Sequence, residues 1–377
     1  VTSIGYIRGQ RIAEVIIYPI QFNPVTAELQ VFTNIEINLA FSGVKSEVSV
    51  NTGIFSNLTQ NVTLNYTEGG MGASVNDRSD RTGSISWVEV TNTSGVIEAD
   101  YLIISASKFW DEQNEDLYAL AQHRAEYNGF DVAIVNVAHV TSDEVGYPYI
   151  DVDFKKEHRI RNFLQSVYEN CTAHNTYDGK LGYVLLVGGD KETIPAEYKL
   201  PSWKQFNGYH GDYAPADYHY SCVTLSNGDY DNHGDLFLGR LSVNSDEKLH
   251  NIVSKTIYFE TEYRFDTWKK NIMLNSGYEE VNSNIDAIES FIPSSFNVIN
   301  LKHSEMDFEL ISQKLVKGFN DGQLITQYRG HGGETTWQTF EVQQFELLIN
   351  YNRQGFVYSM ACNTGSLDHA DDCMAEY

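Results

Sequence analysis

The sequence predicts an α/β protein with a mostly parallel sheet in two half-sheets flanked by helices, preceded by a small antiparallel β module. Beyond residue 100, apolar runs such as YLIIS, DVAIVNV and YVLLVGG alternate with helical segments, which is typical of parallel strands covered on both faces. Residues 1–50 instead alternate apolar and polar positions around a turn at Asn23 and Pro24. This period-two pattern predicts antiparallel strands.

We divide the chain into three parts. Residues 1–86 form a β-rich module that ends in a linker rich in Asn, Thr, Ser, Gly and Asp. Residues 87–243 and 244–377 form a first and a second α/β subdomain. Helices are expected near residues 117–128, 158–169 and 246–263, and residues 301–362 are expected to form a helix, a strand, a helix and a strand. The chain begins without Met and ends in a run like the first turns of a helix, so we expect a processed or incomplete chain.

Composition excludes several classes of protein. Asp and Glu number 51 against 26 Lys and Arg, and the formal net charge of -25 would repel a nucleic acid. No apolar run reaches the 18 residues or so that a membrane span needs. Four cysteines are too few for a disulfide scaffold. We expect a folded monomer without a nucleic-acid partner or a membrane span.

Two reactive side chains follow neighbouring apolar runs. His331 comes after QLITQYRG, Cys362 comes after GFVYSMA, and 31 residues separate them. That distance suits a strand, a helix and a second strand joined by tight loops. In such a unit both carboxyl ends lie on one edge of the sheet, where open α/β sheets bind their ligands. This geometry predicts an enzyme with a cysteine nucleophile.

Glycines around His331 favour the same chemistry. Gly330, Gly332 and Gly333 permit a tight turn close to a bound peptide, and the amides of Gly332 and Cys362 are candidates to stabilise an oxyanion. Two structural alternatives remain open: the glycines form only a loop, and Cys362 is an inert packed side chain. No G-x-S-x-G, H-E-x-x-H, Walker loop or C-x-x-C motif offers a different site.

The motifs GHGGETTW, ACNTG and CMAE resemble the gingipain-type cysteine peptidases, family C25 of the caspase-like clan. YVLLVGGDKETIPAEY and LFLGRLSV resemble the first subdomain of that family, so the likeness covers most of residues 100–377. It implies a caspase-like fold, His331 as general base and acid, Cys362 as nucleophile, and a thioester intermediate. No cofactor would be required for catalysis. Protein or peptide substrates would be cleaved.

The resemblance also implies residues around this pair. In the family, an acidic residue orients the histidine, and Glu279 in NSGYEE is the nearest match. Glu280 is the alternative candidate for this role. A further alternative is that Glu279 is a surface carboxylate with no catalytic role. Residues expected to bind substrate are Trp337, Asn284 and Asp286. Family members that cleave after Arg or Lys use a carboxylate in the substrate pocket, and Asn284 occupies the matching position here. Cleavage after a basic residue is therefore not predicted.

The N-terminal module resembles the tail of the family's propeptide, which covers the active site in the zymogen. Arg78 and Arg81 in NDRSDRTGS suit a processing loop, and we predict cleavage near Arg81. The protein's own N-terminal module would then be its inhibitor. The alternative is that residues 1–86 form a permanent accessory domain.

Three acidic residues suggest a metal site. SNGDYDNHGDLF places Asp229, Asp231 and Asp235 around glycines, and their oxygens would suit a structural calcium ion, although an acidic turn explains them as well. The function we predict is a secreted or cell-surface bacterial cysteine endopeptidase made as a zymogen. The alternatives are a sortase-like processing peptidase of the same family and a catalytically silent surface or adhesion module.

Overall fold

The structure is a computed structural model that describes four strands near the N-terminus and most of the chain beyond Thr82. The described residues are 3–7, 10–14, 20–23, 28–31, 82–91, 96–111, 114–145, 153–173, 176, 179–208, 211–226, 229–262 and 266–377. The first strands form two antiparallel pairs: β1 (Ser3–Ile7) with β2 (Gln10–Glu14), and β3 (Ile20–Asn23) with β4 (Glu28–Val31). The antiparallel prediction for this part is confirmed by these pairs.

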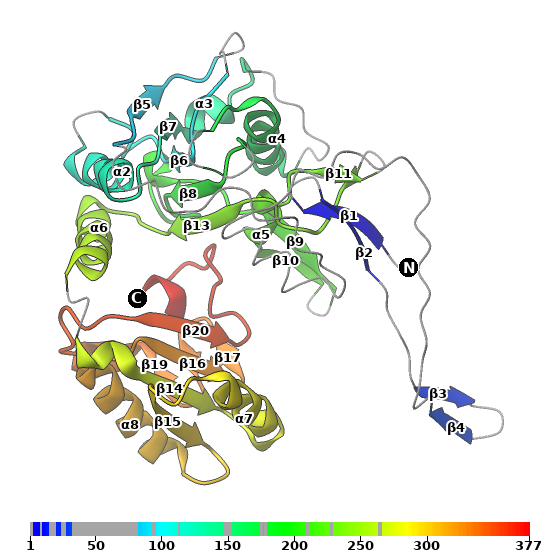
Figure 1. The fold of residues 1–377 in the computed structure, drawn as a ribbon, viewed down its shortest axis with the longest axis vertical. Coiled ribbons are helices and arrows are strands. Elements are labelled where there is room, and N and C mark those ends of the chain that lie inside the picture. Colours follow the sequence, from blue (N-terminus) through cyan, green and yellow to red (C-terminus); the bar gives the residue numbers. More distant parts are fainter. Residues whose placement is uncertain are drawn as a thin grey trace.

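The first α/β sheet has five parallel strands in the order β13, β8, β6, β7, β5 (Figure 1). Their bounds are β5 Ile85–Val88, β6 Tyr101–Ser105, β7 Val132–Asn136, β8 Tyr183–Val187 and β13 Phe237–Leu241. The central strands are apolar and buried along their length, as strands covered on both faces must be. Only the short edge strand β5 was not predicted.

Helices cover both faces of this sheet. The first face packs on α3 and α4, and the other packs on α2 and α6. Their bounds are α2 Glu115–Tyr127, α3 Val137–Val140, α4 Lys155–Asn170 and α6 Asp246–Thr261. Asn114 caps α2 and Ser245 caps α6, each by accepting a bond from a first-turn amide, which satisfies a donor that has no partner within the helix.

Helix α6 belongs to the first sheet. Leu249 and Val253 are buried in the same core as α2, and Glu260 accepts hydrogen bonds from His123 at 2.6 Å and Arg124 at 2.7 Å. The divide between the sheets therefore falls after α6, whereas the predicted seam lies near residues 243–247. The predicted boundary falls too early because the sequence of the LFLGRLSV strand does not show that the helix after it packs back on the first sheet.

The second sheet has four parallel strands in the order β15, β14, β16, β20. Their bounds are β14 Asn271–Ser276, β15 Asn297–Lys302, β16 Ile325–Arg329 and β20 Phe356–Met360. Helix α7 (Asn282–Phe291) packs on one face of this sheet and α8 (Phe308–Asp321) on the other. The two sheets form separate lobes in Figure 1, with α6 and the red end of the chain between them.

The connection from β16 to β20 is not the predicted α-helix. It consists of a small antiparallel sheet, β17 (Gly332–Gly333), β18 (Thr336–Trp337) and β19 (Phe340–Glu341), followed by the 3₁₀-helix η5 (Val342–Leu347). Trp337 and Phe340 enter the core beside Tyr328, and this packing overrides the helical spacing of the apolar residues. The two flanking strands are nonetheless parallel neighbours, as predicted.

Short elements complete the described chain. They are β9 Lys204–Asn207, β10 Asp212–Pro215, α5 Tyr218–Ser221, β11 Leu225–Ser226, β12 Asp229–Tyr230, and the 3₁₀-helices η2 Ala196–Tyr198, η3 Thr267–Lys270, η4 Glu279–Val281 and η6 Met374–Glu376. Strand β1 lies beside β11 in Figure 1. Across the described part of the chain, no helix is both long and apolar enough to cross a bilayer.

Candidate active site

His331 lies just beyond the carboxyl end of β16. Its carbonyl oxygen accepts a bond from the Tyr328 hydroxyl at 2.7 Å, and its N–H donates to Gln338 Oε1 at 3.2 Å. The Tyr328 side chain is fully buried, and burial raises its pKa to about 12, so the hydroxyl stays protonated and available as a donor. These bonds fix the backbone of His331 while its side chain remains exposed.

Cys362 lies just beyond the carboxyl end of the neighbouring strand β20. Its thiol is free and exposed. Asn363, the next residue, has a φ of 60°, a left-handed conformation that asparagine adopts more readily than most residues. The chain therefore turns sharply directly after Cys362, and the thiol stands at the edge of the sheet.

Gly332 brings the two loops into contact. A Cβ at Gly332 would lie 2.8 Å from the Ala361 Cβ, 2.9 Å from the Cys362 carbonyl oxygen and 3.0 Å from a Thr364 methyl carbon. The Gly330 N–H also donates to the Met360 carbonyl at 3.3 Å. The loop of His331 thus packs directly on the backbone around Cys362, as the parallel strand pair predicts. Only a residue without a Cβ fits at Gly332.

Tyr278 stacks on the His331 ring. The ring centroids are 4.9 Å apart and the planes differ by 25°, so the phenol ring limits the orientations of the imidazole. The close approach comes from Gly277, whose N–H donates to the Arg329 carbonyl at 2.9 Å. We did not predict Tyr278, although it directly precedes Glu279 in NSGYEE.

Glu279 and Glu280 begin the 3₁₀-helix η4 at the carboxyl end of β14, one strand away from His331. Both side chains are exposed. Glu279 directly follows Tyr278, whose ring stacks on that of His331. A role of Glu279 in orienting His331 stays a prediction, with Glu280 as its alternative.

The residues predicted to bind substrate lie in different surroundings. The Trp337 ring is only 2% exposed, stacks on Tyr328 at 4.5 Å and donates from Nε1 to Ser359 at 2.9 Å, so it supports the core and offers no surface to a substrate. Asn284 is exposed on α7. Asp286 forms an ion pair with Lys302 at 2.5 Å, which partly neutralises its charge.

In the loop of residues 229–235, carboxylates accept hydrogen bonds from nearby backbone amides. Asp235 is 1% exposed and accepts bonds from the Val223 and Thr224 amides at 3.0 and 2.9 Å, and Asp231 accepts from the His233 amide at 3.0 Å. Asp229 is exposed in β12. Among the residues that the structure describes, no three His, Cys, Asp or Glu side chains are grouped to hold a metal ion. Calcium at this loop therefore stays a prediction.

A second cysteine, Cys373, follows Cys362 by 11 residues. Cys373 is fully buried, and burial together with the Glu376 charge raises its pKa to about 12, so it packs in the core and does not compete with Cys362 as the nucleophile. Arg78 and Arg81 lie outside the described residues.

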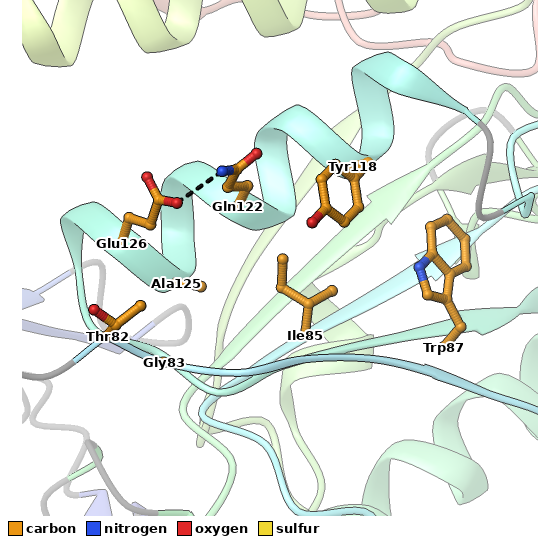
Figure 2. A pocket seen from close by; sticks show the side chains of 8 residues that line it. All are labelled: Thr82, Gly83, Ile85, Trp87, Tyr118, Gln122, Ala125 and Glu126. Atoms are coloured by element: carbon orange, nitrogen blue, oxygen red, sulfur yellow. Dashed lines mark hydrogen bonds between the residues drawn. The ribbon is translucent and has the colours of Figure 1, made fainter.

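A pocket lies apart from the two reactive residues. It is an open hollow between α2 and the edge strand β5 (Figure 2), lined by Thr82, Gly83, Ile85, Trp87, Tyr118, Gln122, Ala125 and Glu126. The Gly83 N–H donates to the Ala125 carbonyl at 2.9 Å and holds the strand against the helix. Neither His331 nor Cys362 contributes to it.

Comparisons with known proteins agree with this architecture. Residues 96–377 match the model of peptidase family C25, and residues 2–73 match that of the C25 propeptide. Gingipain R2 of Porphyromonas gingivalis is 24% identical over 95% of this chain, and Lys-gingipain HG66 of P. gingivalis is 24% identical over the whole chain. These alignments cover 43% and 19% of the relatives, so the chain spans less than half of their length.

Solved structures show the same fold. The Arg-specific cysteine proteinase gingipain R matches with a TM-score of 0.55 and 21% identity, over 75% of this chain and 60% of that one. The complex of the pro- and mature domains of a P. gingivalis gingipain matches with a TM-score of 0.55 and 22% identity, over 73% of this chain and 58% of that one. The predicted caspase-like α/β fold is confirmed.

Proposed function

Because the chain belongs to peptidase family C25, we propose that it is a cysteine endopeptidase with Cys362 as nucleophile and His331 as general base and acid. The observation that carries the proposal is the contact between their loops, in which Gly332 packs on the Cys362 backbone at the carboxyl edge of two neighbouring parallel strands. Both side chains are exposed to a substrate.

In the acylation step, His331 takes the thiol proton and the Cys362 sulfur attacks the carbonyl carbon of the scissile peptide bond. A C–S bond forms and the carbonyl oxygen becomes an oxyanion, for which the amides of Gly332 and Cys362 are the proposed hydrogen-bond donors. His331 then protonates the leaving nitrogen, and the C–N bond breaks. The amine product leaves and a thioester remains on Cys362.

In the deacylation step, a water molecule attacks the thioester carbon while His331 accepts its proton. The C–S bond breaks, His331 returns the proton to the sulfur, and the carboxylic acid product leaves. Tyr278 keeps the imidazole in one orientation through both steps, and Glu279 would stabilise its protonated form. Asn284 remains the candidate substrate contact on α7, and Asp286 would share its charge with Lys302.

We also propose that the protein is made as a zymogen and acts outside a bacterial cell or at its surface. The support for a zymogen is the match of residues 2–73 to the family's propeptide. The N-terminal module would block the site until cleavage near Arg81. A processing peptidase of the same family would use the same site on fewer substrates.

A thiol-reactive peptide electrophile tests this function. The intact chain and a form without residues 1–81 are incubated with the electrophile, and adducts are located by peptide mapping. We expect an adduct on Cys362 that forms faster in the shortened protein. Cys362→Ala should lower peptidase turnover by about 10⁴-fold or more, as loss of a nucleophile does.

Cys373→Ser provides the matched control. This thiol is buried and protonated, so its substitution should leave labelling of Cys362 in place. A chain that folds but forms no Cys362 adduct in either length would contradict the proposal and favour the catalytically silent surface module.

A further inference from the structure

Residues 363–376, which follow the proposed nucleophile, form hydrogen bonds and ion pairs with both lobes of the protein. We call this stretch the post-cysteine segment. It leaves the second sheet at Cys362 and crosses to the carboxyl edge of the first sheet before it ends in η6. Figure 1 shows this red part of the chain between the two lobes. The proposed mechanism does not use it.

On its own lobe, the segment joins the loops of both reactive residues. The Met374 N–H donates to the Glu334 carbonyl at 2.7 Å, and the Ala375 N–H donates to the Thr364 carbonyl at 3.0 Å. The Asn363 side chain also donates to Glu334 Oε1 at 3.3 Å. Glu334 lies shortly after His331, and Thr364 lies shortly after Cys362. A shift of η6 would therefore displace the loops of both reactive residues.

On the first lobe, acidic side chains of the segment meet lysines. The Lys191 ammonium pairs with Asp372 and with Glu376, the latter at 3.0 Å. Lys248 also pairs with Asp372, and Glu376 accepts a bond from the Ser242 hydroxyl at 2.7 Å. Earlier in the segment, Asp368 pairs with Lys204 at 2.7 Å.

Lys191 is the buried centre of these contacts. It follows β8 and is 2% exposed, and the Glu376 side chain is 3% exposed. A buried ion pair gains little stability over apolar side chains, because both charges lose their hydration. It does require a defined geometry, since a displaced partner leaves a charge buried without compensation. The pair thus fixes where η6 sits against the first sheet.

We propose that Lys191 is a positioning residue for the peptidase reaction, which sets the relative placement of His331 and Cys362 through the post-cysteine segment. This inference rests on the proposed function. Lys191 forms ion pairs with Glu376 and Asp372. The amides of η6 in turn donate hydrogen bonds to the carbonyls of Glu334 and Thr364. Glu334 lies in the loop that follows His331, and Thr364 lies in the loop that follows Cys362. Lys191 itself does not contact the reacting atoms.

Kinetics of Lys191→Met and Lys191→Arg test the proposal. Misplacement of reactive groups by about 1 Å lowers a rate by about 100-fold, so we expect kcat of Lys191→Met to fall by about that factor while KM changes little. Lys191→Arg keeps the charge and should recover most of kcat. Lys317→Met removes an exposed lysine that pairs with Asp321 one helical turn away, and should behave like the unmodified protein.

Hydrogen exchange supplies a readout that does not depend on activity. Amides of residues 361–364 and 374–376 should exchange faster in Lys191→Met, with no change in β6 and β7. If Lys191→Met fails to fold, the double variant Lys191→Met with Glu376→Gln removes both buried charges and should show the same losses.

Three results would overturn the inference. They are an unchanged kcat in a folded variant, a loss of kcat fully explained by the unfolded fraction, or unchanged exchange at residues 361–364. An unmodified chain with neither turnover nor labelling of Cys362 would instead contradict the proposed function. The exchange comparison would still decide whether Lys191 holds the two loops.

Discussion

Gly332 controls how closely the loops of His331 and Cys362 approach. A Cβ at this position would lie closer than 3 Å to both the Ala361 Cβ and the Cys362 carbonyl oxygen. We predict that Gly332→Ala pushes the loops apart and lowers kcat by about 100-fold. The cost in stability should be about 1–3 kcal/mol, as for other overpacked sites. Steady-state kinetics and urea denaturation measure the two effects.

Gly365 is the matched control for this variant. It lies three residues after Cys362, and a Cβ there would meet nothing within 4 Å. Gly365→Ala should therefore leave both kcat and stability close to their original values. Equal losses in the two alanine variants would mean that the glycines matter for chain flexibility and not for the contact between the loops.

The sequence predicts some residues of the site better than others. His331 and Cys362 could be found because each directly follows an apolar strand, and parallel strands align their carboxyl ends. Tyr278 could not be found in this way, since its stacking on His331 depends on β14 being the neighbour of β16. Trp337 follows the histidine motif, yet its apolar ring is drawn into the core.

At the level of elements, buried strands were the most predictable feature. Runs such as YLIIS and YVLLV are continuous and apolar because both faces are covered, and they match β6 and β8. Strand β15 was missed because NVINLK lies at a sheet edge and is partly exposed. The apolar residues before β20 are spaced as in a helix, which is why a helix is predicted there. Their spacing instead reflects packing of Trp337 and Phe340 beside Tyr328, a tertiary contact that cannot be inferred from the local sequence.

Strand β20 is an edge strand of the described second sheet and exposes apolar side chains. Phe356, Val357, Tyr358 and Met360 are all about half exposed or more. Edge strands with apolar surfaces promote pairing between chains, and a lysine on the edge opposes it. We predict that Val357→Lys reduces concentration-dependent aggregation of this chain, measured by light scattering, while the melting temperature changes little.

Thr326→Lys serves as the comparison. Thr326 is the in-register neighbour of Val357 on β16 but is only 1% exposed. A lysine there should lower the melting temperature and increase aggregation, because its charge would be buried without a partner. If both variants aggregate like the original chain, β20 is not the surface through which copies associate.

At the level of the whole molecule, the two lobes are joined by charged side chains as well as by the chain itself. Lys191, Lys204 and Lys248 come from the lobe of the first sheet, and their acidic partners come from the post-cysteine segment. None of these residues stood out in the sequence, because isolated lysines and aspartates usually lie on solvated surfaces. Their pairing depends on how the two sheets face each other, which local patterns do not encode.

This junction should weaken in acid. Burial acts to raise the pKa of Asp372, but hydrogen bonds from Lys191 and Lys248 outweigh it, so the pKa lies below its usual value of 3.8. A carboxylate with a lowered pKa in the folded state stabilises the protein at pH values above its unfolded pKa, and this contribution is lost as the pH falls through the folded value. For Lys191, burial acts to lower the pKa, but the hydrogen bonds that its ammonium donates to Asp372 and Glu376 raise the pKa overall, so its charge persists throughout this range.

Asp372→Asn isolates this contribution. We predict that the variant is less stable than the original chain at pH 7, and that the difference shrinks as the pH falls below about 4, where the carboxylate of the original chain becomes protonated. Urea denaturation of both proteins between pH 7 and pH 3 measures the difference. A gap in stability that stays constant down to pH 3 would mean that the charge of Asp372 contributes nothing, and that the variant loses only the shape and hydrogen bonds of the side chain between the two lobes.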